Sequence, residues 1–140
     1  MNAINMKRVL IGGLAAGVVI NLGEFLLNDL ILKDMWEEAL QEWNRQIAYE
    51  NSIFSFVVSS TILGIVLVWI YAGIRPRFGA GPRTALTAGM IVWFLSFAYG
   101  SIGWMAMDLF PKAIFIYSVF WGAIEIAIAS LLGAWIYKEE

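Results

Sequence analysis

Four long runs of apolar residues dominate the sequence and leave few folds open to it. They extend over residues 9–32, 53–74, 84–109 and 113–137. Each is long enough to cross the roughly 30 Å hydrocarbon core of a bilayer, which takes about 20 apolar residues as an α-helix. The runs are continuous rather than alternating, which is typical of membrane helices and not of membrane strands. The sequence therefore predicts an all-α polytopic membrane protein in which four transmembrane helices form a bundle, as a single domain over residues 1–140.

The composition agrees with this class and excludes several functions. Apolar residues make up 61% of the chain and charged residues 14%, against about 25% charged in ordinary globular domains. The net charge of −2 does not suggest a nucleic-acid partner. The absence of Cys and His removes thiolate and imidazole chemistry. We therefore expect no metal site, no cofactor and no enzymatic activity.

The basic residues predict how the chain is oriented in the membrane. One side carries six of them, namely Lys7, Arg8, Arg75, Arg77, Arg83 and Lys138. The other side carries three, namely Lys33, Arg45 and Lys112. Because cytoplasmic loops are enriched in Lys and Arg, we expect both termini in the cytoplasm. The expected location is the plasma membrane, as a multi-pass protein of the bacterial inner membrane.

The connection between the first two spans has the pattern of an amphipathic helix over about residues 34–49. Four apolar residues recur at helical spacing, namely Trp36, Leu40, Trp43 and Ile47. Acidic residues occupy the other face, and the segment is too short to span, so it is expected to lie in the outer membrane interface. It could serve as a solvated cover for the helices or as a docking surface for a partner.

Two glutamates lie within the apolar runs. Glu24 is in the first span and Glu125 is in the fourth, and counting residues from the ends places them at similar depths. No Lys or Arg lies at that depth. An ionised, unpaired carboxyl costs several kcal/mol in hydrocarbon, so both should face the interior and at least one should be protonated. They either form structural hydrogen bonds between helices or make up a site that accepts protons or cations.

Polar and small residues surround these glutamates on helical wheels. The candidate hydrogen-bond partners are Asn21, Asn28, Ser59, Ser96 and Tyr99. The small residues expected to allow close helix packing are Gly13, Gly17, Gly100, Gly103, Gly122 and Gly133.

The chain also resembles a family of small, uncharacterised four-span membrane proteins of bacteria. Residues that carry the resemblance include Arg8-Val9, Gly13, Gly17 and Glu24, together with Trp36 just beyond the first span. The resemblance implies the four-span fold and a membrane location. No activity is assigned to that family, so none is implied for these residues.

Two functions remain open. The first is an ion- or proton-coupled transporter or channel that uses the intramembrane carboxyls. Four short spans enclose little volume, so a pathway would form most easily between protomers of a homo-oligomer. The second is a non-catalytic accessory subunit that docks other membrane subunits through the acidic outer helix. The lipid bilayer is the expected partner in both.

Overall fold

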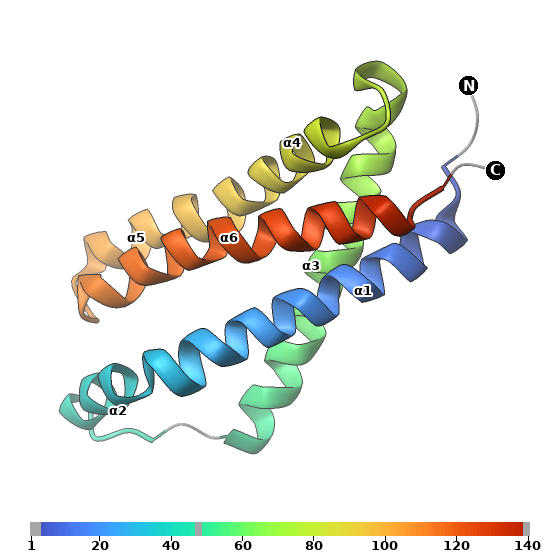
Figure 1. Cartoon of the computed structure of the whole chain (residues 1–140). Helices are drawn as coiled ribbons and strands as arrows, with labels where there is room; N and C mark the ends of the chain where they lie inside the picture. Colours follow the sequence, from blue (N-terminus) through green and yellow to red (C-terminus); the bar gives the residue numbers. More distant parts are fainter. Residues whose placement is uncertain (1–3, 47–48, 139–140) are drawn as a thin grey trace.

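The described part of the chain is helical and contains no β-strand (Figure 1). The computed structural model describes residues 4–46 and 49–138. Four of its helices are long and apolar enough to cross a membrane, namely Met6–Ile31, Ser52–Phe78, Pro82–Met107 and Lys112–Ile136. The predicted all-helical chain with four spans is therefore confirmed, with span ends that differ from the expected ones by a few residues.

The first long helix consists of α1 (Met6–Phe25) and a π-helical segment, η1 (Leu26–Ile31). It begins earlier than expected because Asn5 caps it, and the Asn5 side chain accepts a hydrogen bond from the backbone N–H of Arg8 at 3.1 Å. The short helix α2 (Lys33–Glu42) follows directly.

The second long helix, α3 (Tyr49–Phe78), continues past the expected end of its span and carries Pro76 in its last turn. A tight connection leads from it to the third long helix, and in this connection Gly81 has a φ of 136° that favours glycine. Pro82 then occupies the first turn of the next helix, where its missing N–H costs nothing.

The third long helix is built of α4 (Pro82–Trp93), a second π-helical segment, η2 (Phe94–Tyr99), and α5 (Gly100–Met107). The fourth is the unbroken α6 (Lys112–Ile136). A π-helical turn holds more residues than an α-turn, so it changes which face the following residues occupy. Neither π-helical segment was expected from the sequence.

Helix α1 packs against α3 and α6, and α4 packs against α6 and α3. Figure 1 shows α3 crossing behind the other long helices at a steep angle. Glycines make the crossing of α1 and α3 close, because a Cβ on Gly64 would collide with the backbone of Gly13 and Gly17. Small residues at such crossings allow helix backbones to approach each other within a membrane.

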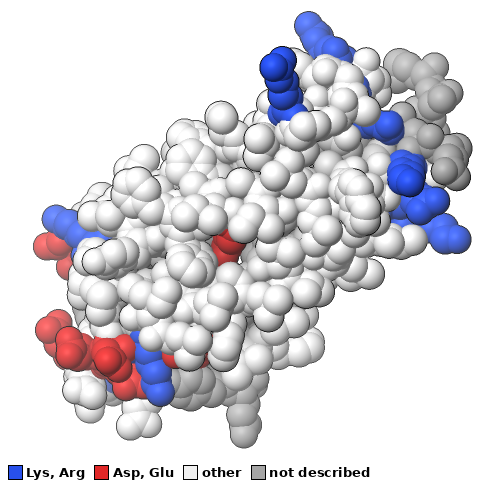
Figure 2. Space-filling view, in the orientation of Figure 1, with Lys and Arg blue, Asp and Glu red and all other residues white. Residues whose placement is uncertain are grey.

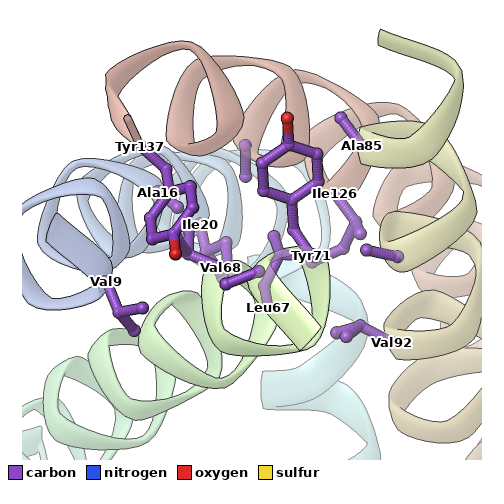
Figure 3. Close-up of a cluster of buried hydrophobic side chains, with 13 residues drawn as sticks. Val9, Ala16, Ile20, Leu67, Val68, Tyr71, Ala85, Val92, Ile126 and Tyr137 are labelled. Atoms are coloured by element: carbon purple, nitrogen blue, oxygen red, sulfur yellow. The ribbon is translucent and has the colours of Figure 1, made fainter. Parts of the chain in front are cut away.

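Two separate clusters of buried apolar residues hold the helices together. The larger one draws on all four long helices, as Val9, Leu67, Val92 and Ile126 illustrate (Figure 3). The smaller one lies toward the end of the molecule that carries α2, and it comprises Leu27, Leu32 and Ile114, with Met35, Trp36 and Trp121 packed against them. The segment of α1 between these clusters carries Glu24.

The charged side chains divide between the two ends of the molecule (Figure 2). The first and last described residues lie at the same end as the connection between α3 and α4, where Lys and Arg gather. The other end, with α2, carries acidic side chains mixed with a few basic ones. Between the ends, the surface is almost free of charge and rich in exposed apolar side chains. This pattern is the one expected of a membrane-embedded protein.

Helix α2 is shorter than predicted. It ends at Glu42 rather than near residue 49, because Asn44 adopts a left-handed conformation with a φ of 52°. The N–H groups of Asn44 and Arg45 then bond to the last helical carbonyls at 2.9 and 3.0 Å, which is how helices commonly stop. Trp43 consequently lies at the helix end and is 52% exposed. Ile47, the last residue of the predicted apolar stripe, lies outside the described residues.

Candidate functional site

Glu24 of α1 and Glu125 of α6 lie beside each other in the interior of the molecule. Their carboxyl groups are close enough to interact electrostatically and to share a hydrogen bond once one of them carries a proton. Glu125 is only 4% exposed, and Glu24 is half-buried. Figure 2 shows acidic atoms in the middle of the otherwise uncharged band. The predicted approach of the two glutamates is therefore present in the structure.

A glycine next to Glu24 makes room for this contact. A Cβ at Gly23 would collide with Oε2 of Glu125. The backbone carbonyl of Gly23 also accepts a hydrogen bond from the indole Nε1 of Trp121 at 3.0 Å. One turn of α1 thus fixes both the position of α6 and the place of the Glu125 carboxyl. Gly23 and Trp121 were not among the predicted site residues.

A short chain of hydrogen bonds leads from Glu24 to α2. The side-chain amide of Asn28 donates to Oε2 of Glu24 at 2.9 Å. The indole Nε1 of Trp36 in turn donates to Oδ1 of Asn28 at 3.1 Å. Because Asn28 lies in η1, the π-helical segment forms part of this connection. The helix predicted as a cover or a docking surface is therefore joined to the carboxyl pair by two hydrogen bonds.

The remaining carboxyl oxygens lack a well-formed hydrogen bond. Oε1 of Glu24 and both oxygens of Glu125 are buried, and none accepts a hydrogen bond of ordinary length and angle from the described residues, although the indole of Trp121 lies beside Glu125. No Lys or Arg contributes to the electrostatic surroundings of either group. A carboxylate is only an acceptor, so two ionised groups here would repel each other in a medium of low dielectric constant. We therefore expect the pair to hold at least one proton.

Aromatic side chains pack together at the end of the molecule that carries α2. The ring of Trp36 meets Phe110 edge-on with centroids 5.6 Å apart. Trp104 contacts Phe110 in the same manner and stacks on Phe115 at 6.3 Å. At the opposite end, the larger apolar cluster separates the pair from the Lys- and Arg-rich surface. Water from either end therefore meets apolar packing before it reaches the carboxyls.

An opening reaches Glu24 from the side. A groove of about 300 Å3 lies between α1, α3 and η2, and it is lined by Ile20, Glu24, Ser59, Ser60, Leu63 and Phe97. Ser59 therefore lines the groove, but its hydroxyl donates to the carbonyl of Ser55 at 2.7 Å rather than to a glutamate. The groove was not foreseen from the sequence.

Other predicted site residues lie elsewhere. The Asn21 amide donates to the Gly17 carbonyl at 2.9 Å and to the Thr61 hydroxyl at 3.3 Å, so it ties α1 to α3. Ser96 and Tyr99 lie on the exposed face of η2, where Tyr99 is 65% exposed. Of the seven candidates, the structure places four at the carboxyl pair or along its groove, namely Glu24, Glu125, Asn28 and Ser59.

The predicted packing glycines also divide into two groups. Gly13 and Gly17 lie against α3, Gly122 lies under the ring of Phe97, and Gly133 lies against Val68. In contrast, a Cβ on Gly100 or Gly103 would meet nothing within 4 Å. Gly12, Gly23, Gly64 and Gly89 also make close contacts in the structure.

Trp36 offers a direct test of the link between α2 and the carboxyl pair. Trp36→Phe keeps an aromatic ring on Phe110 but removes the donor to Asn28. A lost hydrogen bond of this kind destabilises a protein by about 1 kcal/mol, so we expect the midpoint of unfolding in detergent to fall. Trp43→Phe is the matched control, because Trp43 is exposed at the end of α2. Equal midpoints for the two variants would contradict the hydrogen-bonded connection.

The chain matches no protein-family model, no curated protein and no solved structure. Its class therefore follows from the helices and the site alone. Four long apolar helices define a membrane-embedded, all-helical protein. Within that class, this chain is distinguished by a buried pair of carboxyl groups beside a lateral groove.

Proposed function

We propose that the protein moves protons or cations across the membrane by loading and unloading the Glu24–Glu125 pair. The observation that carries this proposal is the contact of two carboxyl groups that have no basic partner among the described residues and three of whose oxygens are buried without a well-formed hydrogen bond. An ionisable group within a membrane span is costly and is commonly part of a proton or ion pathway. If these side chains only held α1 and α6 together, neutral amides at positions 24 and 125 could do so.

The test uses the purified protein in liposomes that contain a pH-sensitive dye. A pH gradient imposed across these vesicles should dissipate faster than across protein-free vesicles. The rate should rise further when a potential, inside negative, draws cations inward. A gradient that decays at the protein-free rate under all conditions would contradict the proposal.

An accessory role is the second candidate, and the surface of α2 is the feature that favours it. Asp34, Glu38 and Glu42 are exposed at the end of the molecule opposite the Lys- and Arg-rich end. An acidic surface of this kind suits a partner with a basic patch. Inert liposomes together with other membrane subunits that co-purify with the chain would support this role instead of transport.

We also propose that copies of the chain associate with one another. A Cβ added to Gly100 or Gly103 of α5 would meet nothing within 4 Å, so the helix surface at these two glycines is open. Small residues on a membrane helix allow a second helix to approach closely. A second copy would also enclose more volume than four helices can alone.

The proposed orientation has both termini in the cytoplasm of a bacterial cell. Its support is the excess of Lys and Arg at the end where the described chain begins and finishes. Reporter domains fused at either terminus or inserted at Gly81 should therefore report the cytoplasm. A reporter inserted near Asn44 should report the opposite side, and a cytoplasmic signal there would reverse the orientation.

A further inference from the structure

The groove beside Glu24 opens within the apolar band of the molecule. Its rim is formed by α3 and η2, whose outward faces carry apolar side chains. Ile62 is 55% exposed and Phe94 is 49% exposed. The apolar packing at both ends separates the groove from the charged surfaces. A molecule that enters the groove therefore comes from the hydrocarbon of the bilayer and not from water.

The walls and the floor of the groove have different chemistry. Ile20, Leu63 and Phe97 make the walls apolar, and Ser59 and Ser60 add two hydroxyl groups. The carboxyl of Glu24 is the acidic group of the lining. Behind it lies Glu125, which is 4% exposed and has two oxygens without a well-formed hydrogen bond. The groove thus combines apolar walls with one carboxyl group, which is negatively charged once a proton leaves.

We propose that this groove binds a primary ammonium ion that carries a hydrophobic body and reaches the site from the bilayer. The proposal rests on the proposed function, since the carboxyl pair must give up a proton. The ammonium group donates N–H bonds to the carboxylate of Glu24, which lines the groove, and its charge replaces that of the lost proton. Its apolar body lies against Ile20 and Leu63, and the Phe97 ring offers a surface that attracts cations.

The size of the groove agrees with this occupant. At about 300 Å3 it lies at the lower end of the range found for small-molecule pockets. This volume suits an amine with one phenyl ring and a short chain, which would lie in the open groove, better than it suits a drug-sized molecule. Polar solutes such as sugars or nucleotides would leave most of their hydrogen-bonding groups without partners among these walls.

Proton and amine compete for the same oxygens. The amine binds as R–NH3⁺ and keeps its own N–H bonds, and the proton that leaves the carboxyl pair passes to water. Glu125 on α6 is the titratable group that faces Glu24, since α3 contributes serines and η2 contributes Phe97 to the described surroundings. Binding should therefore weaken as pH falls, and it should release a proton into weakly buffered solution.

The test is equilibrium dialysis of 3-phenylpropylamine against the purified protein in lipid nanodiscs, with empty nanodiscs subtracted. Butylbenzene, which replaces the ammonium by a methyl group, is the neutral control. We expect saturable binding of the amine and only unsaturable partitioning of butylbenzene. Glu24→Gln should reduce the affinity for the amine by at least about tenfold, because it removes the charge that the ammonium faces. Glu38→Gln, an exposed acidic residue of α2, should leave the affinity unchanged.

A second variant tests the groove itself. Ser59→Phe fills the groove from an exposed position and leaves both carboxyls in place. It should abolish amine binding while the unfolding midpoint in detergent stays close to that of the parent protein. Amine binding that survives Ser59→Phe or Glu24→Gln would overturn the inference, as would the absence of saturable binding in a protein that still conducts protons. Loss of proton flux in the unaltered protein would instead defeat the proposed function.

Discussion

Replacing Glu125 by Gln is expected to abolish proton flux through liposomes while the helices stay folded and packed. An amide has no proton to exchange at any working pH, so it cannot load and unload as a carboxyl does. The amide has nearly the same shape as the carboxyl, and it brings a donor to a place where Oε1 of Glu24 lacks one. The free energy of unfolding should therefore change by no more than about 1 kcal/mol.

Two further variants complete this experiment. Glu24→Gln should abolish flux in the same way, because the two carboxyls act as a pair. Glu38→Gln removes an equal charge from the exposed face of α2 and should leave flux unchanged. Flux that persists in Glu125→Gln and Glu24→Gln would mean that the pair only joins α1 to α6, and the transport proposal would then fail.

Infrared spectroscopy shows the protonation of the pair directly. At neutral pH we expect a carboxyl C=O stretch from a protonated glutamic acid that is shielded from water. This band should shift or disappear in Glu125→Gln, since the hydrogen-bond partner of Glu24 changes. A spectrum in which every glutamate is ionised would contradict the requirement for a proton on the pair.

The four spans and the depth of the glutamates could be predicted because both depend on local properties. Span length follows from the thickness of hydrocarbon, and depth follows from the rise of a helix. The approach of Glu24 to Glu125 could also be predicted, because an ionisable side chain that faces lipid is costly and both glutamates should therefore face the interior. The role of Gly23 could not be predicted from the sequence. It depends on how α1 and α6 are aligned against each other, and the pattern of a single helix does not show that alignment.

Span three shows why a helical wheel can fail. At a constant 100° per residue, Gly89, Ser96 and Gly100 share one face. In the structure, Gly89 is buried against Ser130, whereas Ser96 and Gly100 are exposed. The π-helical segment Phe94–Tyr99 begins after Gly89 and contains Ser96, and it changes the angular position of the residues from Phe94 onward. A wheel for this span is therefore valid only as far as Trp93.

The length of α2 depended on a single residue. The apolar spacing of Trp36, Leu40 and Trp43 is compatible with a longer helix, and nothing in that spacing marks an end. Asn44 tolerates the left-handed conformation that stops the helix. The hydrogen bond from Trp36 to Asn28 also had no signal in the sequence, because it joins two elements across a turn.

Adding one methyl group at Gly64 is expected to weaken the fold more than any single change at the surface. In Gly64→Ala, the new Cβ would collide with the backbone N of Gly17 and the carbonyl O of Gly13. Backbone atoms cannot rotate away as a side chain can, so α1 and α3 must separate. Overpacking of this kind costs about 1–3 kcal/mol. We therefore expect a lower unfolding midpoint, which circular dichroism in detergent would measure.

Gly73→Ala is the matched control, because Gly73 lies in the same helix and a Cβ there meets nothing within 4 Å. Alanine favours a helix over glycine by up to about 1 kcal/mol, so this variant should be as stable as the parent or slightly more stable. The separation of α1 from α3 in Gly64→Ala should also widen the groove beside Glu24, which both helices line. Equal midpoints for Gly64→Ala and Gly73→Ala would show that α1 and α3 do not cross at Gly13, Gly17 and Gly64, and the groove between them would lose its structural basis.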